Sequence, residues 1–222
     1  MLTPTSQRQP RPLLVLGVIA GPLYVAAGLA HALMREGFDM RRHALSLLSN
    51  GEFGWVQIAN FIASGALVVA GAVGCRLALR SQPAGTWGPI LLGLYGVGLI
   101  GAGIFLADPS NGFPPGVEAP ESLTTSGLLH FVFGGLGFYA IIAACFVFAR
   151  RFSRQGRKGL AWGSALTGVG FFVSFAAIAS GSTAPSVLIA FYVAIAWVWA
   201  WHTIVLADVL RQSSADSVSA VP

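Results

Sequence analysis

The sequence predicts an all-α integral membrane protein, a bundle of six transmembrane helices with a short interfacial helix between helices one and two. Two observations carry this prediction. Hydrophobic residues make up 55% of the 222 residues and charged residues only 9%, whereas soluble globular proteins carry roughly 25% charged residues. The apolar residues also gather into six runs that approach the roughly 20 residues needed to cross the hydrocarbon core of a bilayer.

Each run is expected to be a helix, because a segment in lipid must satisfy its own backbone hydrogen bonds and no run alternates as a barrel strand does. The six runs are residues 13–33, 55–79, 89–107, 127–149, 160–180 and 185–207. A signal peptide is the alternative for the first run, since RQPRP precedes it and AHA imitates a cleavage site. A retained first helix gives the more consistent topology.

The chain is expected to form one membrane domain, at residues 13–210. Residues 1–12 and 211–222 are polar or contain proline and show no apolar period, so both are predicted to be disordered cytoplasmic ends. The first three and last three helices show no repeat of the kind that builds inverted-repeat transporters. This counts against a transporter.

The basic residues predict the orientation, because Lys and Arg in short loops stay on the cytoplasmic side. With the N-terminus inside, ten of the 13 basic residues fall inside: Arg8, Arg11, Arg76, Arg80, Arg150, Arg151, Arg154, Arg157, Lys158 and Arg211. The outer set is Arg35, Arg41 and Arg42. Both termini are therefore predicted to be cytoplasmic.

The net charge of +5 does not indicate nucleic-acid binding, since topology explains where the charges lie and no basic patch interleaves with aromatic residues. The cluster RRFSRQGRK also suits contact with anionic lipid headgroups, although topology is the simpler explanation. Membrane lipids are the expected partners, no nucleic acid is expected, and a homo-oligomer is left open. Cys75 and Cys145 lie in apolar runs without CxxC spacing and are interpreted as core residues.

Glycines in the third and fourth runs predict close helix packing. The stretch GLYGVGLIGAG, residues 93–103, matches GxGxxG, but that dinucleotide-binding pattern requires a strand, a turn and a helix N-terminus. Inside a membrane span, small residues instead let helices approach closely. Gly127, Gly134 and Gly137 are predicted to form a similar face on the fourth helix.

The segment between the first two runs, EGFDMRRHALSLLSNGEFGW, predicts a short amphipathic helix at the outer interface. Asp39 suits an N-cap, Gly51 suits a C-terminal stop, and apolar residues recur between them at helical spacing. The opposite face carries Arg42, His43, Ser46, Ser49 and Asn50. Trp55 and Trp87 stand at predicted span ends on opposite sides of the membrane, as interfacial anchors do.

Residues capable of chemistry gather at the predicted outer level. The third run ends at Asp108, the fourth begins just before His130, the first ends at His31, and the outer segment supplies His43. A carboxylate at the membrane surface is expected to face a partner or a wet cavity, and His130 and Arg42 are its natural partners. The sequence therefore predicts an outward-facing polar pocket.

The candidate ligand-binding residues are His31, Arg42, His43, Ser46, Ser49, Asp108 and His130. As an alternative, His31, His43, Asp108 and His130 have the ligand types of a zinc site, with Ser46 or Ser49 positioning a substrate. Neither HxxxH nor HExxH spacing supports that metal site. A triad of Ser46, His130 and Asp108 is weaker still because no GxSxG is present, and no catalytic residue is predicted.

The first helix is expected to turn a polar stripe inward, because Tyr24, Gly28, His31 and Arg35 share one face. The fourth histidine, His202, follows WVWAW near the inner end of helix six and is expected at the membrane interface.

Two stretches carry a family resemblance: DMRRHALSLLSNGEFGWVQIANF after the first helix, and DPSNGFPPG followed by TTSGLLHFVFGG. With six spans, they resemble the bacterial membrane family called domain of unknown function 998, over residues 13–210. That family is similar in turn to Frag1/DRAM/Sfk1-type membrane proteins. The matching positions are His43, Ser46, Ser49, Trp55, Asp108, Gly112, Pro114, Thr125, Gly127 and His130.

The resemblance implies the fold, the topology and a location in the bacterial inner (plasma) membrane, and it points to the same outer cluster. It implies no activity. The chain also distantly resembles the seven-span lipid amidases related to ceramidases, but it lacks their seventh span and paired histidines.

The predicted function is a multi-pass membrane protein whose outward His/Asp pocket binds a lipid headgroup or small ligand. One alternative is a metal-dependent hydrolase acting on lipid at the outer leaflet, with zinc as its cofactor. A small transporter is the further alternative, but none of the six runs carries a charged residue near mid-membrane.

Overall fold

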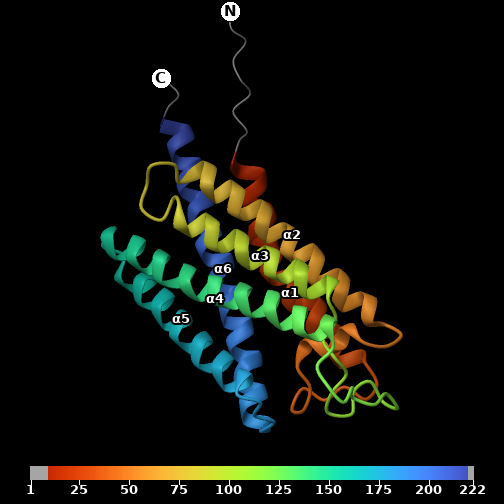
Figure 1. The fold of residues 1–222 in the computed structure, drawn as a ribbon. Helices are drawn as coiled ribbons and strands as arrows, with labels where there is room; N and C mark the ends of the chain where they lie inside the picture. Colours follow the sequence, from red (N-terminus) through yellow and green to blue (C-terminus); the bar gives the residue numbers. More distant parts are fainter. Residues whose placement is uncertain (1–9, 220–222) are drawn as a thin grey trace, which may run out of the picture.

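The six long helices close into a ring in chain order. The computed structural model describes residues 10–219, with side chains up to residue 213. Its helices are α1 (Pro10–Met34), α2 (Gly54–Ala78), α3 (Trp87–Ile104), α4 (Thr125–Arg154), α5 (Lys158–Ala179) and α6 (Pro185–Ser219), with a 3-10 helix η1 (Leu45–Ser49) between α1 and α2. Each long helix packs on the next, and α6 packs back on α1 (Figure 1). All six are long and apolar enough to cross a membrane, which confirms the predicted fold class.

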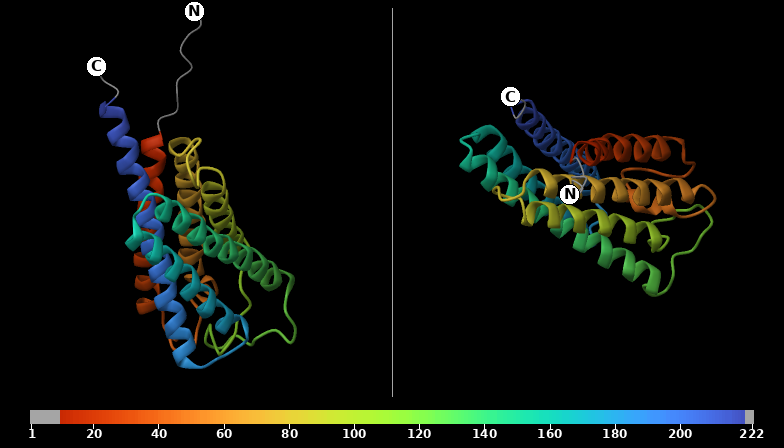
Figure 2. Two further views of the ribbon diagram at one scale, coloured as in Figure 1. Left: turned by 90° about the vertical axis from the view of Figure 1, so that its left-hand side faces the viewer. Right: turned by 90° about the horizontal axis from the view of Figure 1, so that it is seen from above.

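The bundle has two unlike ends. The start of α1, the α2–α3 and α4–α5 connections and the last described turns of α6 lie at one end, here called the arginine-rich end (Figure 2). The opposite end, here called the long-loop end, holds the connections 35–53, 105–124 and 180–184. The first two of these connections contain all the predicted outer residues except His31 and His130.

Glycines set the distance between neighbouring helices in the ring. A Cβ at Gly98 of α3 would lie 2.8 Å from the Cα of Gly137 on α4, and one at Gly96 would lie 2.7 Å from the carbonyl oxygen of Gly65 on α2. Such distances leave no room for a side chain. The predicted glycine packing holds at these positions but not at Gly134, where an added Cβ would meet nothing within 4 Å.

The third helix ends at Ile104, earlier than the predicted end at Asp108. Phe105 is extended, with φ −98° and ψ 115°, and the carbonyls that follow accept hydrogen bonds from other parts of the chain. Asn50 Nδ2 donates to the Ala107 oxygen over 3.0 Å, and Ser126 Oγ donates to the Leu106 oxygen over 3.0 Å. These contacts replace the helical hydrogen bonds, so the apolar run continues while the helix does not.

The short helix predicted between α1 and α2 is present, but it is shorter than expected and is a 3-10 helix. Only the five residues of η1 are helical, and Leu45, Leu47, Leu48 and Ser49 are buried against the bundle. Asp39 caps a turn instead of a helix, because its carboxylate accepts from the Arg41 backbone N–H over 2.8 Å. The apolar spacing reflects burial under the bundle rather than an interfacial helix.

The structure differs from three further predictions, which concern the two ends of the chain and His202. Helix α1 already begins at Pro10 and α6 is helical to Ser219, so both predicted disordered ends overlap helix; residues 1–9 and 220–222 lie outside the described part. His202 is 1% exposed and packs edge-on against Trp199, with ring centroids 5.6 Å apart. It is therefore a buried residue and not the expected interfacial one.

Candidate functional site

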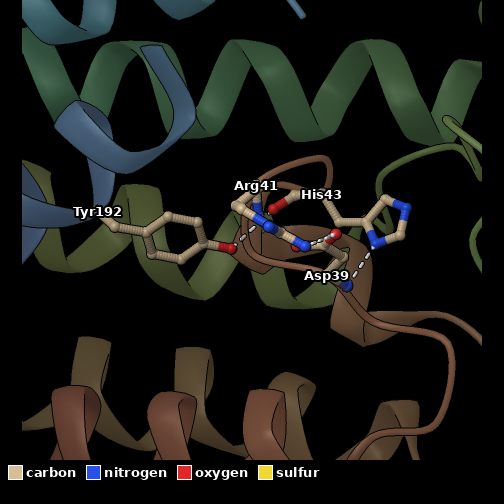
Figure 3. Close-up of polar contacts among 4 residues, drawn as sticks. All are labelled: Asp39, Arg41, His43 and Tyr192. Atoms are coloured by element: carbon tan, nitrogen blue, oxygen red, sulfur yellow. Dashed lines mark hydrogen bonds and ion pairs between the residues drawn. The ribbon is translucent and has the colours of Figure 1, made fainter. Parts of the chain in front are cut away.

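His43 ties the two long connections of the long-loop end together. Its Nδ1 accepts from the Asp39 backbone N–H over 2.9 Å, and its Nε2–H donates to the Asn111 carbonyl over 3.1 Å. Tyr192 of α6 donates its hydroxyl to the His43 carbonyl over 2.7 Å (Figure 3). Both ring nitrogens are thus occupied by backbone groups, which leaves neither free for a metal or ligand.

An exposed ion pair stands beside this histidine. Arg41 Nε lies 3.2 Å from Asp39 Oδ1 (Figure 3). The side-chain hydrogen bond from Arg41, followed by its backbone hydrogen bond, holds the pKa of Asp39 below its ordinary value, and the same carboxylate raises the pKa of Arg41. Because the pair is exposed, it contributes little to stability.

Asp108 organises the start of α4. Its carboxylate accepts from the backbone N–H and the hydroxyl of Thr124, the N-cap residue, whose own oxygen accepts from the Gly127 N–H over 3.0 Å. A carboxylate at a helix N-terminus is also favoured by the helix dipole. A Cβ at Gly127 would meet the Asp108 carboxylate at 2.3 Å, so this glycine leaves room for the carboxylate.

His130 connects α4 to the end of α3. Its Nδ1–H donates to the carbonyls of Ala102 and Phe105, over 3.0 and 2.9 Å. These carbonyls stand at the end of α3, where the helix itself supplies no donors. The arrangement fixes the tautomer and leaves Nε2 as an acceptor without a protein partner among the described residues.

A cavity of about 490 Å³ lies within the bundle and reaches the His130 ring. Helices α1 to α6 and the segment just before and within η1 all contribute to its wall. The wall is predominantly apolar, with aromatic side chains from Phe61, Phe131, Phe138, Phe175 and Phe191. No Asp, Glu, Lys or Arg belongs to the described residues that line it. A volume in this range is typical of sites for small molecules.

Four neutral polar groups belong to this apolar cavity. The hydroxyls of Tyr24, Tyr95 and Ser46 and the Nε2 atom of His130 make no hydrogen bond to any other residue that the structure describes. Trp199 orients the two tyrosines, with its ring centroid 4.7 Å from that of Tyr24 and 5.4 Å from that of Tyr95. Buried polar groups normally have hydrogen-bond partners, so these four atoms can serve a ligand or water.

The structure divides the predicted site residues. Ser46 and His130 line the cavity, while His43 and Asp108 hold the connections. His31 and Ser49 are buried, and neither the His31 ring nitrogens nor the Ser49 hydroxyl has a partner among the described residues.

The side chain of Arg42 is exposed, and only its backbone carbonyl takes part in the loop, accepting from Asn111 Nδ2 over 3.2 Å. Within the described part of the chain, no three His, Cys, Asp or Glu side chains are grouped as metal ligands. The proposed set of His31, His43, Asp108 and His130 therefore does not assemble into a metal site in this structure.

The sequence analysis did not identify Tyr95 of the cavity or a polar stripe on α2. Gln57, Asn60 and Ser64 are buried, with Asn60 Nδ2 donating to the Tyr24 carbonyl over 3.1 Å and Ser64 Oγ donating to Asn60 Oδ1 over 3.3 Å. Their i, i+3 and i+7 spacing inside an apolar run was the available signal, because polar residues within spans face the bundle interior. The inward stripe predicted on α1 is confirmed for Tyr24, Gly28 and His31, which are buried.

Comparison of the sequence with known proteins identifies a family. A family model described as "Protein of unknown function (DUF998)" matches residues 18–208, and neither the curated proteins nor the solved structures gave a match. The similarity to Frag1/DRAM/Sfk1-type proteins stays a prediction. The match runs from the third turn of α1 into α6 and so includes parts of all six long helices.

Proposed function

Because this chain belongs to the membrane family described as "Protein of unknown function (DUF998)", whose description names no activity, we propose a function from the cavity itself. The protein binds a neutral, lipid-like molecule inside its helix bundle. The observation that carries this proposal is the set of four unpartnered polar atoms in an aromatic cavity of about 490 Å³.

The lining defines the chemistry of the ligand. An aromatic wall favours a large apolar body, since burying apolar surface supplies the binding energy. The absence of charged groups among the described lining residues disfavours a charged headgroup, because a buried charge without a partner is costly. The tyrosine and serine hydroxyls fit a ligand with neutral oxygen groups, such as an alcohol, ester or quinone, and the His130 acceptor fits a ligand hydroxyl.

Filling the cavity tests the proposal. The Gly134→Leu variant adds a side chain where an added Cβ meets no atom within 4 Å, and Gly134 lines the cavity. We expect it to fold normally and to lose saturable binding of a pyrene-labelled long-chain alcohol, measured by quenching of tryptophan fluorescence in detergent. Neutral lipids that co-purify with the wild-type protein should be depleted in the variant by mass spectrometry.

A matched control separates ligand loss from a general effect of the substitution. Gly163 of α5 is equally open to a Cβ but does not line the cavity, so Gly163→Leu should bind like the wild type. The double variant Tyr24→Phe, Tyr95→Phe keeps the aromatic wall and should weaken binding about 10-fold through two lost hydrogen bonds. Identical binding curves for wild type and Gly134→Leu would refute the proposal.

We also infer that the arginine-rich end faces the cytoplasm of a bacterial inner membrane, which puts both termini inside. The distribution of basic residues supports this orientation. A cysteine at Glu118→Cys, exposed in the connection 105–124, should react with a membrane-impermeant maleimide in intact cells. One at Arg80→Cys, exposed at the other end, should react only after permeabilisation. Both native cysteines are buried, and the reverse labelling pattern would invert the orientation.

A further inference from the structure

Besides the cavity, the protein has an open groove at the arginine-rich end. It lies between the last turns of α4 and the first turn of α5. Its volume is about 680 Å³. The polar residues that line it are Arg150, Ser153, Arg154 and Lys158, and Trp162 and two alanines complete it. No residue of the groove belongs to the cavity described above.

The three cations of this groove have no anionic partner within the described chain. Arg150, Arg154 and Lys158 are exposed and make no side-chain hydrogen bond or ion pair to a described residue. Asp208 is the one acidic side chain described at this end, and Arg157 already occupies it through two hydrogen bonds of 2.8 and 2.6 Å. The Asp208 hydrogen bond raises the pKa of Arg157. The groove therefore keeps its full positive charge for an external anion.

Other basic residues on α4 and in the α4–α5 connection do have partners within the protein. Arg151, next to Arg150, is buried and donates to the Pro83 carbonyl and to the side chains of Gln82 and Gln212. The bundle thus uses Arg151 and Arg157 internally and leaves the three groove residues unpaired. A positive-inside signal requires only the charges, not their convergence on one groove.

The start of α5 adds a second favourable element. Lys158 is its first residue, Arg157 is its N-cap, and no side chain caps the first amides of the helix. The N-terminus of a helix attracts anions through its free N–H groups and its dipole. Because the first turn of α5 lines the groove, this field adds to that of the three cations.

Two exposed tryptophans indicate the depth of the groove in the membrane. Trp162 on its rim is 69% exposed, and Trp87, which shares a smaller pocket with Arg150 and Arg154, is 65% exposed. Tryptophan concentrates at the membrane–water interface. Arg150 and Arg154 line both of these pockets, so we expect the cations at the level of the lipid headgroups.

We propose that this groove binds the phosphate group of an anionic phospholipid. The guanidinium groups of Arg150 and Arg154, the Lys158 ammonium and the Ser153 hydroxyl donate to the phosphate oxygens, and the acyl chains lie against Trp162 on the lipid-facing surface. Guanidinium groups match phosphate geometry, and the site is separate from the neutral ligand of the cavity.

Lipid binding by a matched pair of triple variants tests the proposal. The groove variant Arg150→Gln, Arg154→Gln, Lys158→Gln removes the three free cations. The control Arg11→Gln, Arg80→Gln, Arg211→Gln removes three exposed cations from the same end without touching the groove. Titrations of detergent-purified protein with short-chain phosphatidylglycerol and phosphatidylcholine report on charge preference.

We expect the wild type to prefer phosphatidylglycerol. The groove variant should bind this lipid about 100-fold more weakly, because each of the three basic residues contributes a roughly equal factor to the affinity for an anionic lipid. The control variant should keep the preference. Equal losses of phosphatidylglycerol affinity in the two variants would overturn the proposal, because the lipid would then be attracted by the overall charge of this end and not by the groove. Saturable binding of inorganic phosphate as tight as that of the lipid would overturn it in favour of a soluble phosphate ligand.

Discussion

Replacing Arg151 by methionine is expected to lower the free energy of unfolding by about 3 kcal/mol, since it removes three part-buried hydrogen bonds that one buried guanidinium donates, each contributing about 1 kcal/mol. Arg151 is 1% exposed, and its Nη1 donates to the Pro83 carbonyl over 2.8 Å. Its Nη2 donates to Gln82 Oε1 over 3.1 Å and to Gln212 Oε1 over 2.9 Å. One guanidinium thus joins α4 to the α2–α3 connection and to α6, and methionine replaces its volume but none of these bonds.

The measurement is the melting temperature of the purified protein in detergent, which should fall by about 6–12 °C in Arg151→Met. Arg150→Met is the matched control, because the neighbouring side chain is exposed and has no internal partner. It should change stability by less than about 0.5 kcal/mol. Arg151→Lys should fall between the two, since a single ammonium cannot reproduce the planar fork. Equal melting temperatures for the Met variants at 150 and 151 would contradict this account.

The His43→Ala variant is expected to lose about 3–4 kcal/mol, through two broken hydrogen bonds and the space left by a buried ring. The ring packs against both Phe38 and Phe113, with centroid distances of 5.4 and 5.3 Å. The His43 bond to the Asn111 carbonyl joins the connection 35–53 to the connection 105–124. Loss of this bond should therefore loosen the second connection as well as the first.

Hydrogen exchange resolves this effect by region. Amides in residues 105–124 should exchange faster in His43→Ala, whereas amides in α5, which the histidine does not contact, should keep their rates. Arg42→Ala serves as the control, because the contact at that position uses the backbone carbonyl and not the exposed side chain. Unchanged exchange in residues 105–124 would show that His43 does not hold the second connection.

The structure gives His43 and Asp108 structural roles that spacing alone did not reveal. Their side chains were expected to face a shared pocket because they lie at one level of the bundle. In the structure, backbone groups engage both ring nitrogens of His43, and the N-cap of α4 engages the carboxylate of Asp108. Polar residues at helix ends have unpaired backbone groups close by, and sequence does not tell which of these a side chain will meet.

The cavity depends on residues from distant parts of the chain. Tyr24 of α1 and Tyr95 of α3 reach it together with His130 of α4. The packing of each helix on its neighbours, including the close approach of Gly98 to Gly137 and the closure of α6 on α1, brings these residues together. A one-dimensional apolar pattern identifies an inward face but does not give the tilt of each helix or the space left between helices.

The sequence by itself determined the six helices and the contrast between the two ends of the bundle, because hydropathy and charge act locally: each apolar run must be helical in lipid, and each short basic loop carries its own charge. Tertiary structure decided where α3 ends, that only Leu45–Ser49 of the segment 39–51 forms a helix, a 3-10 helix buried against the bundle, and which polar groups line the cavity. In each of these cases a contact with another element, such as Asn50 with the Ala107 carbonyl or His130 with the Phe105 carbonyl, outweighs the local preference.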